Sequence, residues 1–147
     1  MQFIAVDPGA MCGLLQYDDE TTVKYQIEHH PYRTIQLIDE ITRGDVVLVV
    51  EKYLITPMTH KLTRQYDALE TIGALRYVAM KHSWTFELQP TSVKDKVHNS
   101  TLRTLGWYQP SRGDHMNDAA RHAFVALCRH RPHDDLVKRA LGMIGSN

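Results

Sequence analysis

Five consecutive apolar residues, Val46-Val47-Leu48-Val49-Val50, constrain the fold of this chain more than any other feature. A continuous β-branched run of this kind is typical of a strand buried on both faces, which is usually a central strand of a parallel sheet. A helical spacing of apolar residues precedes the run, and another follows it. The sequence therefore predicts an α/β layer fold in which this strand has a parallel neighbour.

The other patterns along the chain complete an order of βββαβαβα. Strands are expected at residues 2–7, 13–17, 22–27, 45–51 and 84–88, and the first three suggest an antiparallel meander. Helices are expected at residues 31–42, 63–81, 116–129 and 134–144, with one or two short helices at residues 92–105. At 147 residues one domain is the default, since domains usually hold about 100–150 residues. We therefore expect residues 1–147 to form a single domain.

Composition disfavours several other classes of protein. A hydrophobic fraction of 43% and a charged fraction of 23% argue against a disordered chain. No apolar run approaches the roughly 20 residues that a membrane helix needs. The first residues lack the basic start of a signal peptide, and the two cysteines, Cys12 and Cys128, have no close spacing. We expect no membrane contact and a location in a reducing cytoplasm.

The net charge of zero hides an uneven distribution. Residues 1–51 carry 3 basic and 9 acidic side chains, for a net charge of −6, whereas residues 52–112 carry 9 basic and 4 acidic ones, for +5. A cluster of carboxylates facing a basic surface suits a site that binds metal ions and a polyanion. The alternative is chance segregation of charge along the chain.

Two carboxylates directly follow apolar strands. Asp7 comes after Phe3-Ile4-Ala5-Val6 and before the turn Pro8-Gly9, and Glu51 comes after the five-residue apolar run. Burying a carboxylate is costly unless a cation meets it, and two central strands can place both acids at one edge of the sheet. Hard divalent cations such as Mg²⁺ are held by carboxylates of this kind. The alternative is that each acid only ends its strand in solvent.

A third group of polar residues lies at the helix predicted for residues 116–129. His115, Asp118 and His122 are three and four residues apart, which puts them on one face of a helix. Asp114 or Asn117 would cap its start. Small residues would let the helix pack closely on the sheet, namely Ala119, Ala120 and Ala123. The alternatives are helix-start or packing roles for the histidines, and a structural zinc site, which the lack of a nearby cysteine disfavours.

In their order along the chain, these motifs resemble those of RuvC-type Holliday junction resolvases, and look most like phage-encoded RuvC-like proteins. The resemblance covers residues 1 to about 130. The matching segments are Asp7-Pro8-Gly9 with Gly13, Val49-Val50-Glu51, Ala68–Arg76, Gln89–Lys94 and His115-x-x-Asp118-Ala119-Ala120.

The resemblance implies a ribonuclease H-like fold, with a five-stranded mixed sheet in the order 3-2-1-4-5 flanked by helices. It also implies a homodimeric, metal-dependent DNA endonuclease of recombination, repair and phage DNA processing. Such an enzyme resolves Holliday junctions and other branched DNA by paired symmetric nicks, leaving a 5′-phosphate and a 3′-hydroxyl. If the gene belongs to a phage, the enzyme would act in the host cytoplasm.

Two Mg²⁺ or Mn²⁺ ions per active site are part of what the resemblance implies. The residues carried over as catalytic and metal-binding are Asp7, Glu51, His115 and Asp118, with Asp114 and His122 supporting them. His115 stands where many members of the family have Asp. An imidazole offers a softer ligand and one less negative charge, which bears on the choice between Mg²⁺ and Mn²⁺.

Phosphate contacts would hold the DNA in position. The candidates are Lys52, Lys61, Arg64, Lys94, Lys96, Arg103 and Arg112, together with Tyr53, near where the family carries an aromatic residue that enters the junction. The helix predicted at residues 63–81 is the candidate dimer interface, because its apolar face continues through Leu69, Ile72, Gly73 and Arg76. Two-fold symmetry would let paired sites cut opposed strands.

Three other functions fit parts of the pattern. A broader structure-selective nuclease that cuts flaps, forks and other branched DNA would use the same four residues. A non-catalytic DNA-binding module would explain why a carboxylate is missing at His115. A nucleotide-binding protein of the sugar-kinase and actin type also has a first strand that ends in an Asp-Gly-rich turn, but this chain is too short for its two lobes.

Overall fold

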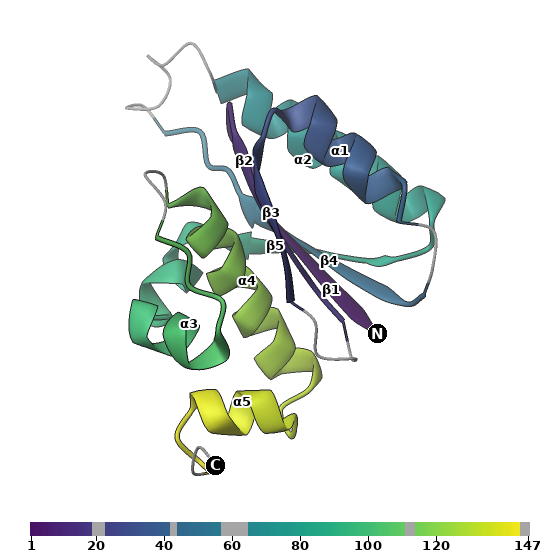
Figure 1. Ribbon diagram of the computed structural model, residues 1–147. Helices are drawn as coiled ribbons and strands as arrows, with labels where there is room; N and C mark the ends of the chain where they lie inside the picture. Colours follow the sequence, from purple (N-terminus) through teal and green to yellow (C-terminus); the bar gives the residue numbers. More distant parts are fainter. Residues whose placement is uncertain (19–22, 42–43, 57–64, 111–113, 145–147) are drawn as a thin grey trace.

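The computed structural model describes residues 1–18, 23–41, 44–56, 65–110 and 114–144. Its strands form one mixed sheet in the order β3-β2-β1-β4-β5 (Figure 1). The strands are Gln2–Asp7 (β1), Cys12–Tyr17 (β2), Val23–His29 (β3), Val46–Lys52 (β4) and Thr85–Pro90 (β5). The helices are Pro31–Asp39 (α1), Gln65–Lys81 (α2), the 3₁₀ helix Thr91–Lys96 (η2), Asn99–Leu105 (α3), His115–His130 (α4) and Asp135–Ala140 (α5). The expected α/β class and strand order are confirmed.

The parallel pairing of β1 with β4 brings the ends of these two strands together. Val6 lies opposite Val50, so Asp7 and Glu51, which follow them, lie at the same edge of the sheet, where the two parallel strands end. Strand β2 runs antiparallel to β1 on its other side. Strand β4 is buried along its apolar length between β1 and β5, as its unbroken apolar and mostly β-branched sequence predicts.

Side chains of the central strands alternate between two cores, one on each face of the sheet. Phe3 and Ala5 belong to the core that α4 covers together with α3 and α5. Ile4 and Val6 belong to the core beneath α1 and α2. Figure 1 shows the sheet between these two layers of helices. Both faces of the central strands are therefore covered, which explains their lack of polar residues.

Helix α4 packs closely on the sheet because small residues line its buried face, namely Ala119, Ala120, Ala123 and Ala126. The closest approach is at Gly13 on β2, where an added Cβ atom would lie 2.0 Å from the carbonyl oxygen of His115. Gly13 is also the partner of Asp7 in the pairing of β1 with β2. The absence of a side chain at Gly13 therefore lets the first turn of α4 lie beside the end of β1.

The buried face of α2 differs from the expected one. Leu69, which the sequence pattern put on one apolar face with Ile72, is 36% exposed, whereas Ala68 is buried. The buried stripe runs through Ala68, Ile72, Leu75 and Ala79. That stripe follows the i, i+4, i+7, i+11 spacing of a helix and leaves Leu69 at its edge. Ile72, which the sequence pattern named for the candidate dimer interface, belongs to this buried stripe and is 9% exposed.

The ends of several helices also differ from the sequence predictions. The last helix ends at Ala140 rather than at residue 144, because Gly142 takes a left-handed conformation with φ of 69°. The one or two short helices expected at residues 92–105 are two, η2 and α3. The expected helical residues 42, 63 and 64 lie outside the described part of the chain. Within the described part, no helix combines the length and hydropathy needed to cross a lipid bilayer.

Replacing Gly13 with alanine should push the start of α4 away from the sheet. We expect G13A to lower the free energy of unfolding by about 3 kcal/mol or more, because backbone atoms would have to move. G106A is the comparison, since Gly106 has a φ of 73° and nothing lies within 4 Å of an added Cβ. Its cost should be about 1 kcal/mol, from backbone conformation alone. Urea unfolding measures the free energy of unfolding of both variants. Equal losses would contradict the close approach of α4 to Gly13.

Candidate active site

Three carboxylates meet at the edge of the sheet where β1 and β4 end. Asp7 ends β1, Glu51 is the last residue but one of β4, and Asp118 lies in the first turn of α4. Ligand oxygens of the three lie within 4.8 Å of one another. Asp7 and Glu51 are 6% and 9% exposed, and the Asp118 side chain is 13% exposed. The structure thus brings together the three acids that the sequence pattern singled out.

The donor set of this carboxylate cluster fits a hard divalent cation. Three carboxylates supply the oxygen ligands that Mg²⁺ and Mn²⁺ prefer. Like charges at this separation repel one another, and their burial strengthens the repulsion, so a cation among them is favoured. Within the described residues the converging group contains only carboxylates, which disfavours the structural zinc site considered from the sequence.

Asp7 is contacted by His115 at the start of α4. His115 Nδ1 lies 2.7 Å from Asp7 Oδ2. Burial raises the pKa of Asp7, the hydrogen bond from His115 lowers it, and the charge of Glu51 raises it, with a net rise. The His115 side chain is 44% exposed and does not belong to the group of three converging ligands. Its role as a metal ligand stays a prediction.

Glu51 is held by His122 and Lys94. His122 Nε2 donates to Glu51 Oε2 at 3.0 Å, and Lys94 Nζ donates to the same oxygen at 3.4 Å. Burial alone would raise the pKa of Glu51, but the hydrogen bond from His122 and the charge of Lys94 outweigh it and lower the pKa to about 2. His122 is fully buried, with Nδ1 2.9 Å from Gln89 Oε1. Glu51 is therefore ionised and fixed in orientation.

Two basic side chains contact Asp118. Lys94 Nζ donates to Asp118 Oδ2 at 2.9 Å, and Arg121 donates to Oδ1. Burial lowers the pKa of Lys94, but the hydrogen bond to Asp118 and the charge of Glu51 outweigh it, so the pKa rises overall. The Lys94 ammonium therefore stays charged among the carboxylates.

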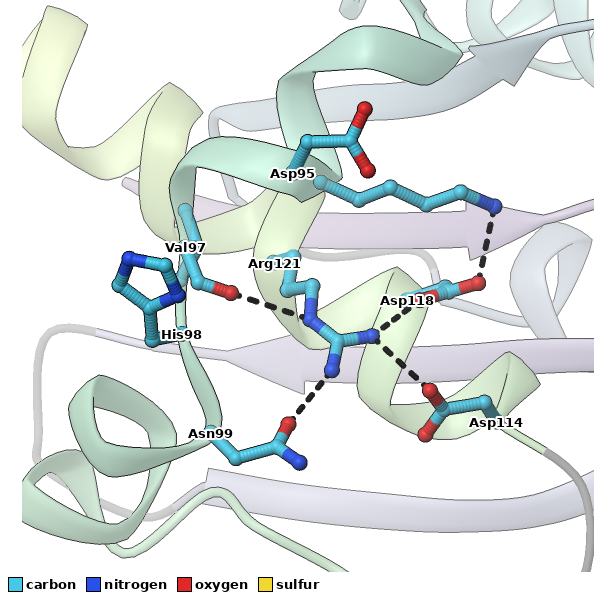
Figure 2. Close-up of a pocket in the computed structure, with 8 residues that line it drawn as sticks. Asp95, Val97, His98, Asn99, Asp114, Asp118 and Arg121 are labelled. Atoms are coloured by element: carbon cyan, nitrogen blue, oxygen red, sulfur yellow. Dashed lines mark hydrogen bonds and ion pairs between the residues drawn. The ribbon is translucent and has the colours of Figure 1, made fainter.

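Arg121 has partners on three segments of the chain. Its side chain is 10% exposed. Nε donates to the carbonyl oxygen of Val97 at 3.1 Å, and Nη2 donates to Asn99 Oδ1 at 2.5 Å. Nη1 donates to Asp118 and, at 3.3 Å, to Asp114. Figure 2 shows the guanidinium between these groups. Arg121 thereby ties Asp118 to the segment that joins η2 to α3.

Asp114 precedes α4 but its side chain does not cap the helix. Its carboxylate instead accepts hydrogen bonds from Asn117 Nδ2 at 3.0 Å and from Arg121. The hydrogen bond from Asn117 and the charge of Arg121 lower the pKa of Asp114. Asp114 is the N-cap residue of α4, one of the two expected alternatives. It caps through its carbonyl oxygen, which accepts from the backbone N–H of Asp118 at 2.7 Å, while Asn117 and Arg121 take its carboxylate oxygens. Asp114 is linked to the carboxylate cluster by Arg121, which donates to both Asp114 and Asp118.

The basic residues predicted to bind DNA differ in their surroundings. Lys52, Lys96 and Arg103 are exposed, and the Arg103 guanidinium lies over the Tyr108 ring at 4.3 Å from its centre. Lys94 instead lies in the carboxylate cluster. The remaining candidates fall outside the described residues, namely Lys61, Arg64 and Arg112.

Tyr53, the predicted aromatic contact, is half-buried against the core beneath α1 and α2. The next two residues, Leu54 and Ile55, are 53% and 58% exposed. An apolar side chain that enters a DNA junction has to project from the surface. The exposed apolar residues that follow β4 are therefore better placed for such a contact than Tyr53 itself.

A cavity of about 410 Å³ adjoins the carboxylate cluster. Lys94, Asp118 and Arg121 line it on the side of the cluster, and Figure 2 shows Asp118 and Arg121 joined there. The other lining residues are Asp95, Val97, His98, Asn99 and Asp114. A space of this size, with charged groups of both signs on its wall, would admit a phosphodiester unit beside the carboxylates.

Comparison with known proteins finds similarity in structure but not in sequence. No family model and no curated protein matches the chain. The structure of Thermus thermophilus RuvC in complex with a Holliday junction substrate aligns with a TM-score of 0.63 and 16% identity, over 90% of this chain and 96% of that one. This chain has the RuvC fold. A second structure of T. thermophilus RuvC aligns with a TM-score of 0.61 and 14% identity, over 88% and 96% of the two chains.

The RuvC fold confirms the ribonuclease H-like architecture that the sequence resemblance implied. At such low sequence identity, the match shows that the two backbones follow a similar path, and it does not show that individual side chains have the same role. The residues that surround the carboxylate cluster are therefore judged from their own contacts in this protein.

Sequence reasoning missed several residues that contact the site, among them Gln89, Asn99 and Arg121. One signal for Arg121 was present, since a charged residue beside Ala120 on the buried face of a helix needs a partner, and Asp118 is three residues away. Gln89 and Asn99 gave no comparable signal. They come from other segments, and only the packing of those segments against α4 brings them near His122 and Arg121.

Removing the Arg121 guanidinium should destabilise the protein, because Asp118 would lose a buried partner. We expect R121M to lower the free energy of unfolding by about 3 kcal/mol, the usual cost of breaking a buried ion pair. R129M is the matched control on the same helix, since Arg129 pairs with Glu87 at 57% side-chain exposure. Its loss should be at most about 1 kcal/mol. Chemical denaturation compares the two, and equal losses would contradict a stabilising role for Arg121.

Proposed function

We propose that this protein is a metal-dependent DNA endonuclease that resolves Holliday junctions and other branched DNA. The observation that carries the proposal is the convergence of Asp7, Glu51 and Asp118 at one edge of a sheet with the RuvC fold. One of the similar structures is that of T. thermophilus RuvC in complex with a Holliday junction substrate. The cavity beside the carboxylates offers room for a DNA phosphate next to them.

Asp7, Glu51 and Asp118 would hold Mg²⁺ or Mn²⁺, with His115 as a further ligand. Bound there, divalent ions lower the pKa of a water molecule and neutralise negative charge on the scissile phosphate. Two ions per site and the 5′-phosphate and 3′-hydroxyl products belong to the same proposal.

The other residues of the site would keep the ligands in place. His122 fixes Glu51 from within the core, and Arg121 fixes Asp118 while it holds the segment after η2. Ligands whose rotamers are locked by such contacts lose little conformational freedom when a metal and a substrate bind. Asp114 contributes indirectly, by holding Arg121.

DNA would lie across the edge of the sheet that carries the carboxylate cluster. Lys52 follows Glu51 directly and is exposed, and Lys96 and Arg103 present further positive charge on η2 and α3. Contacts from these residues would be made to phosphates and would fix position rather than sequence. Leu54 and Ile55, exposed just after β4, would supply apolar contacts to unstacked bases at a junction.

The outer face of α2 is the proposed surface for a homodimer. Its exposed residues include Leu69, Tyr77 and Met80, at 36%, 61% and 70% exposure, with Gly73 and Arg76 between them. Large apolar side chains aligned on one helix face favour association with a partner. A two-fold axis through this face would pair two active sites for symmetric nicks on opposed strands.

We place this activity, with the chain as a single nuclease domain, in recombination and phage DNA processing in the cytoplasm.

Cleavage of synthetic DNA tests the proposed function. Wild-type protein with Mg²⁺ or Mn²⁺ should introduce paired symmetric nicks in a four-way junction and leave a linear duplex intact. D7N should cut at least about 100-fold more slowly, because loss of a ligand charge removes several kcal/mol of electrostatic stabilisation. D135N is the matched control, since Asp135 on α5 is 79% exposed and pairs with Lys138 of its own helix.

Three outcomes would revise the proposal. Equal cutting of a flap and a four-way junction would identify a broader structure-selective nuclease. Junction binding without cutting by either metal would identify a DNA-binding module with an inactive site. Unchanged cutting by D7N would remove the carboxylate cluster from the mechanism.

The dimer surface can be tested separately from catalysis. We expect wild-type protein to run as a dimer in size-exclusion chromatography with light scattering, and M80E to run as a monomer, because a buried carboxylate at an apolar interface lacks a partner. M143E is the control, since Met143 is 68% exposed and follows α5, which lies at the other end of the molecule from α2 (Figure 1). A dimeric M80E protein would exclude this face of α2.

A further inference from the structure

The ammonium of Lys94 lies inside the carboxylate cluster. Nζ is 2.9 Å from Asp118 Oδ2 and 3.4 Å from Glu51 Oε2. Asp118 and Glu51 are two of the three residues whose oxygens converge for a cation. A positive charge from the protein's own chain thus occupies oxygens that a metal ion would need.

Lys94 and Arg121 both contact Asp118, but they are held very differently. The Arg121 guanidinium also donates to Val97, Asn99 and Asp114, and its side chain is 10% exposed. The Lys94 side chain is 26% exposed, and its contacts with the two acids are made by one atom at the end of a flexible four-carbon stem. Arg121 is therefore a fixed part of the site, whereas the Lys94 ammonium can leave it by rotation of its stem.

We propose that Lys94 competes with a divalent metal ion for Asp118 and Glu51, so that the DNA-free protein binds metal weakly on this side of the carboxylate cluster. The inference rests on the proposed function, because it takes the cluster to be a metal site. The ammonium uses the same oxygen lone pairs as an ion would. It also repels a divalent ion that approaches within a few ångströms, and the partial burial of the site strengthens this repulsion.

The cavity beside the cluster gives the ammonium an alternative partner. Lys94 lines this cavity together with Asp118 and Arg121. A DNA phosphate in the cavity would attract the ammonium away from the carboxylates and leave their oxygens to the metal. DNA and a metal ion would then both favour the state in which the Lys94 ammonium has left the carboxylates. Two ligands that favour the same state of a protein raise each other's affinity.

Mn²⁺ binding in the absence of DNA tests the competition directly. Free Mn²⁺ is counted from its electron paramagnetic resonance signal while the full-length protein is titrated. K94M removes the charge but adds no metal ligand, and we expect it to bind Mn²⁺ roughly 10- to 100-fold more tightly than wild type. K96M is the matched control, because Lys96 lies two residues further on the same 3₁₀ helix and is exposed. It should bind Mn²⁺ as wild type does.

Two further variants assign the effect to this site. K94R keeps the positive charge and should bind Mn²⁺ as weakly as wild type. In the double variant K94M/D118N the gain in affinity should disappear, because Asp118 supplies the oxygen that Lys94 releases. If K94M binds Mn²⁺ no more tightly than wild type, or if K96M gains as much as K94M, the competition is excluded.

Thermal unfolding gives a second measurement in case K94M is less stable. Without metal, K94M should melt below wild type, since Asp118 and Glu51 lose a counter-charge. Saturating Mn²⁺ should raise its melting temperature more than that of wild type. An equal or smaller rise in K94M would overturn the inference.

These results separate the inference from the proposed function. Tighter Mn²⁺ binding by K94M in a protein that never cuts DNA would uphold the competition and reject the nuclease. Metal-dependent junction cutting by wild type, with no gain in Mn²⁺ affinity in K94M, would uphold the nuclease and reject the competition.

Discussion

The parallel pairing of β1 with β4 is the constraint on which the rest of the structure depends. It aligns Val6 with Val50 and so brings two buried carboxylates, Asp7 and Glu51, to the same edge of the sheet. Buried like charges oppose folding unless other groups compensate them. The charged and imidazole groups around this edge supply that compensation. A divalent cation would add to it, and the chemistry proposed for the site follows from the same electrostatic need.

Helix α4 links the core to the site. Its small residues pack on the sheet, and the lack of a side chain at Gly13 lets its first turn approach the end of β1. The same helix carries Asp118 together with Arg121 and His122, which contact Asp118 and Glu51. Because residues three and four apart share a helix face, one element delivers both a carboxylate and the groups that hold the carboxylates in place.

The relation to T. thermophilus RuvC lies in the path of the chain, since 16% of the aligned residues are identical while 90% of this chain superposes. A layer fold tolerates such divergence because apolar residues of similar size replace one another in its cores. The residues at the edge of the sheet are under a different constraint, since a change of charge at one of them changes the electrostatic energy of the charged groups beside it. In this chain the three carboxylates are contacted by the imidazole of His115, the buried guanidinium of Arg121 and the ammonium of Lys94.

Local patterns in the sequence predicted the α/β class, the buried strand β4, the small-residue face of α4 and the three carboxylates, because periodicity and the cost of burying charge act between near neighbours. The strand order came from the resemblance between motifs and not from periodicity. Tertiary structure decided which groups meet across the chain. Lys94 lies 43 residues from Glu51 and 24 residues from Asp118, so its place among the acids follows from the docking of η2 against α4 and not from any local pattern. The exposure of Leu69 and the burial of Arg121 were decided in the same way, by the elements packed against them.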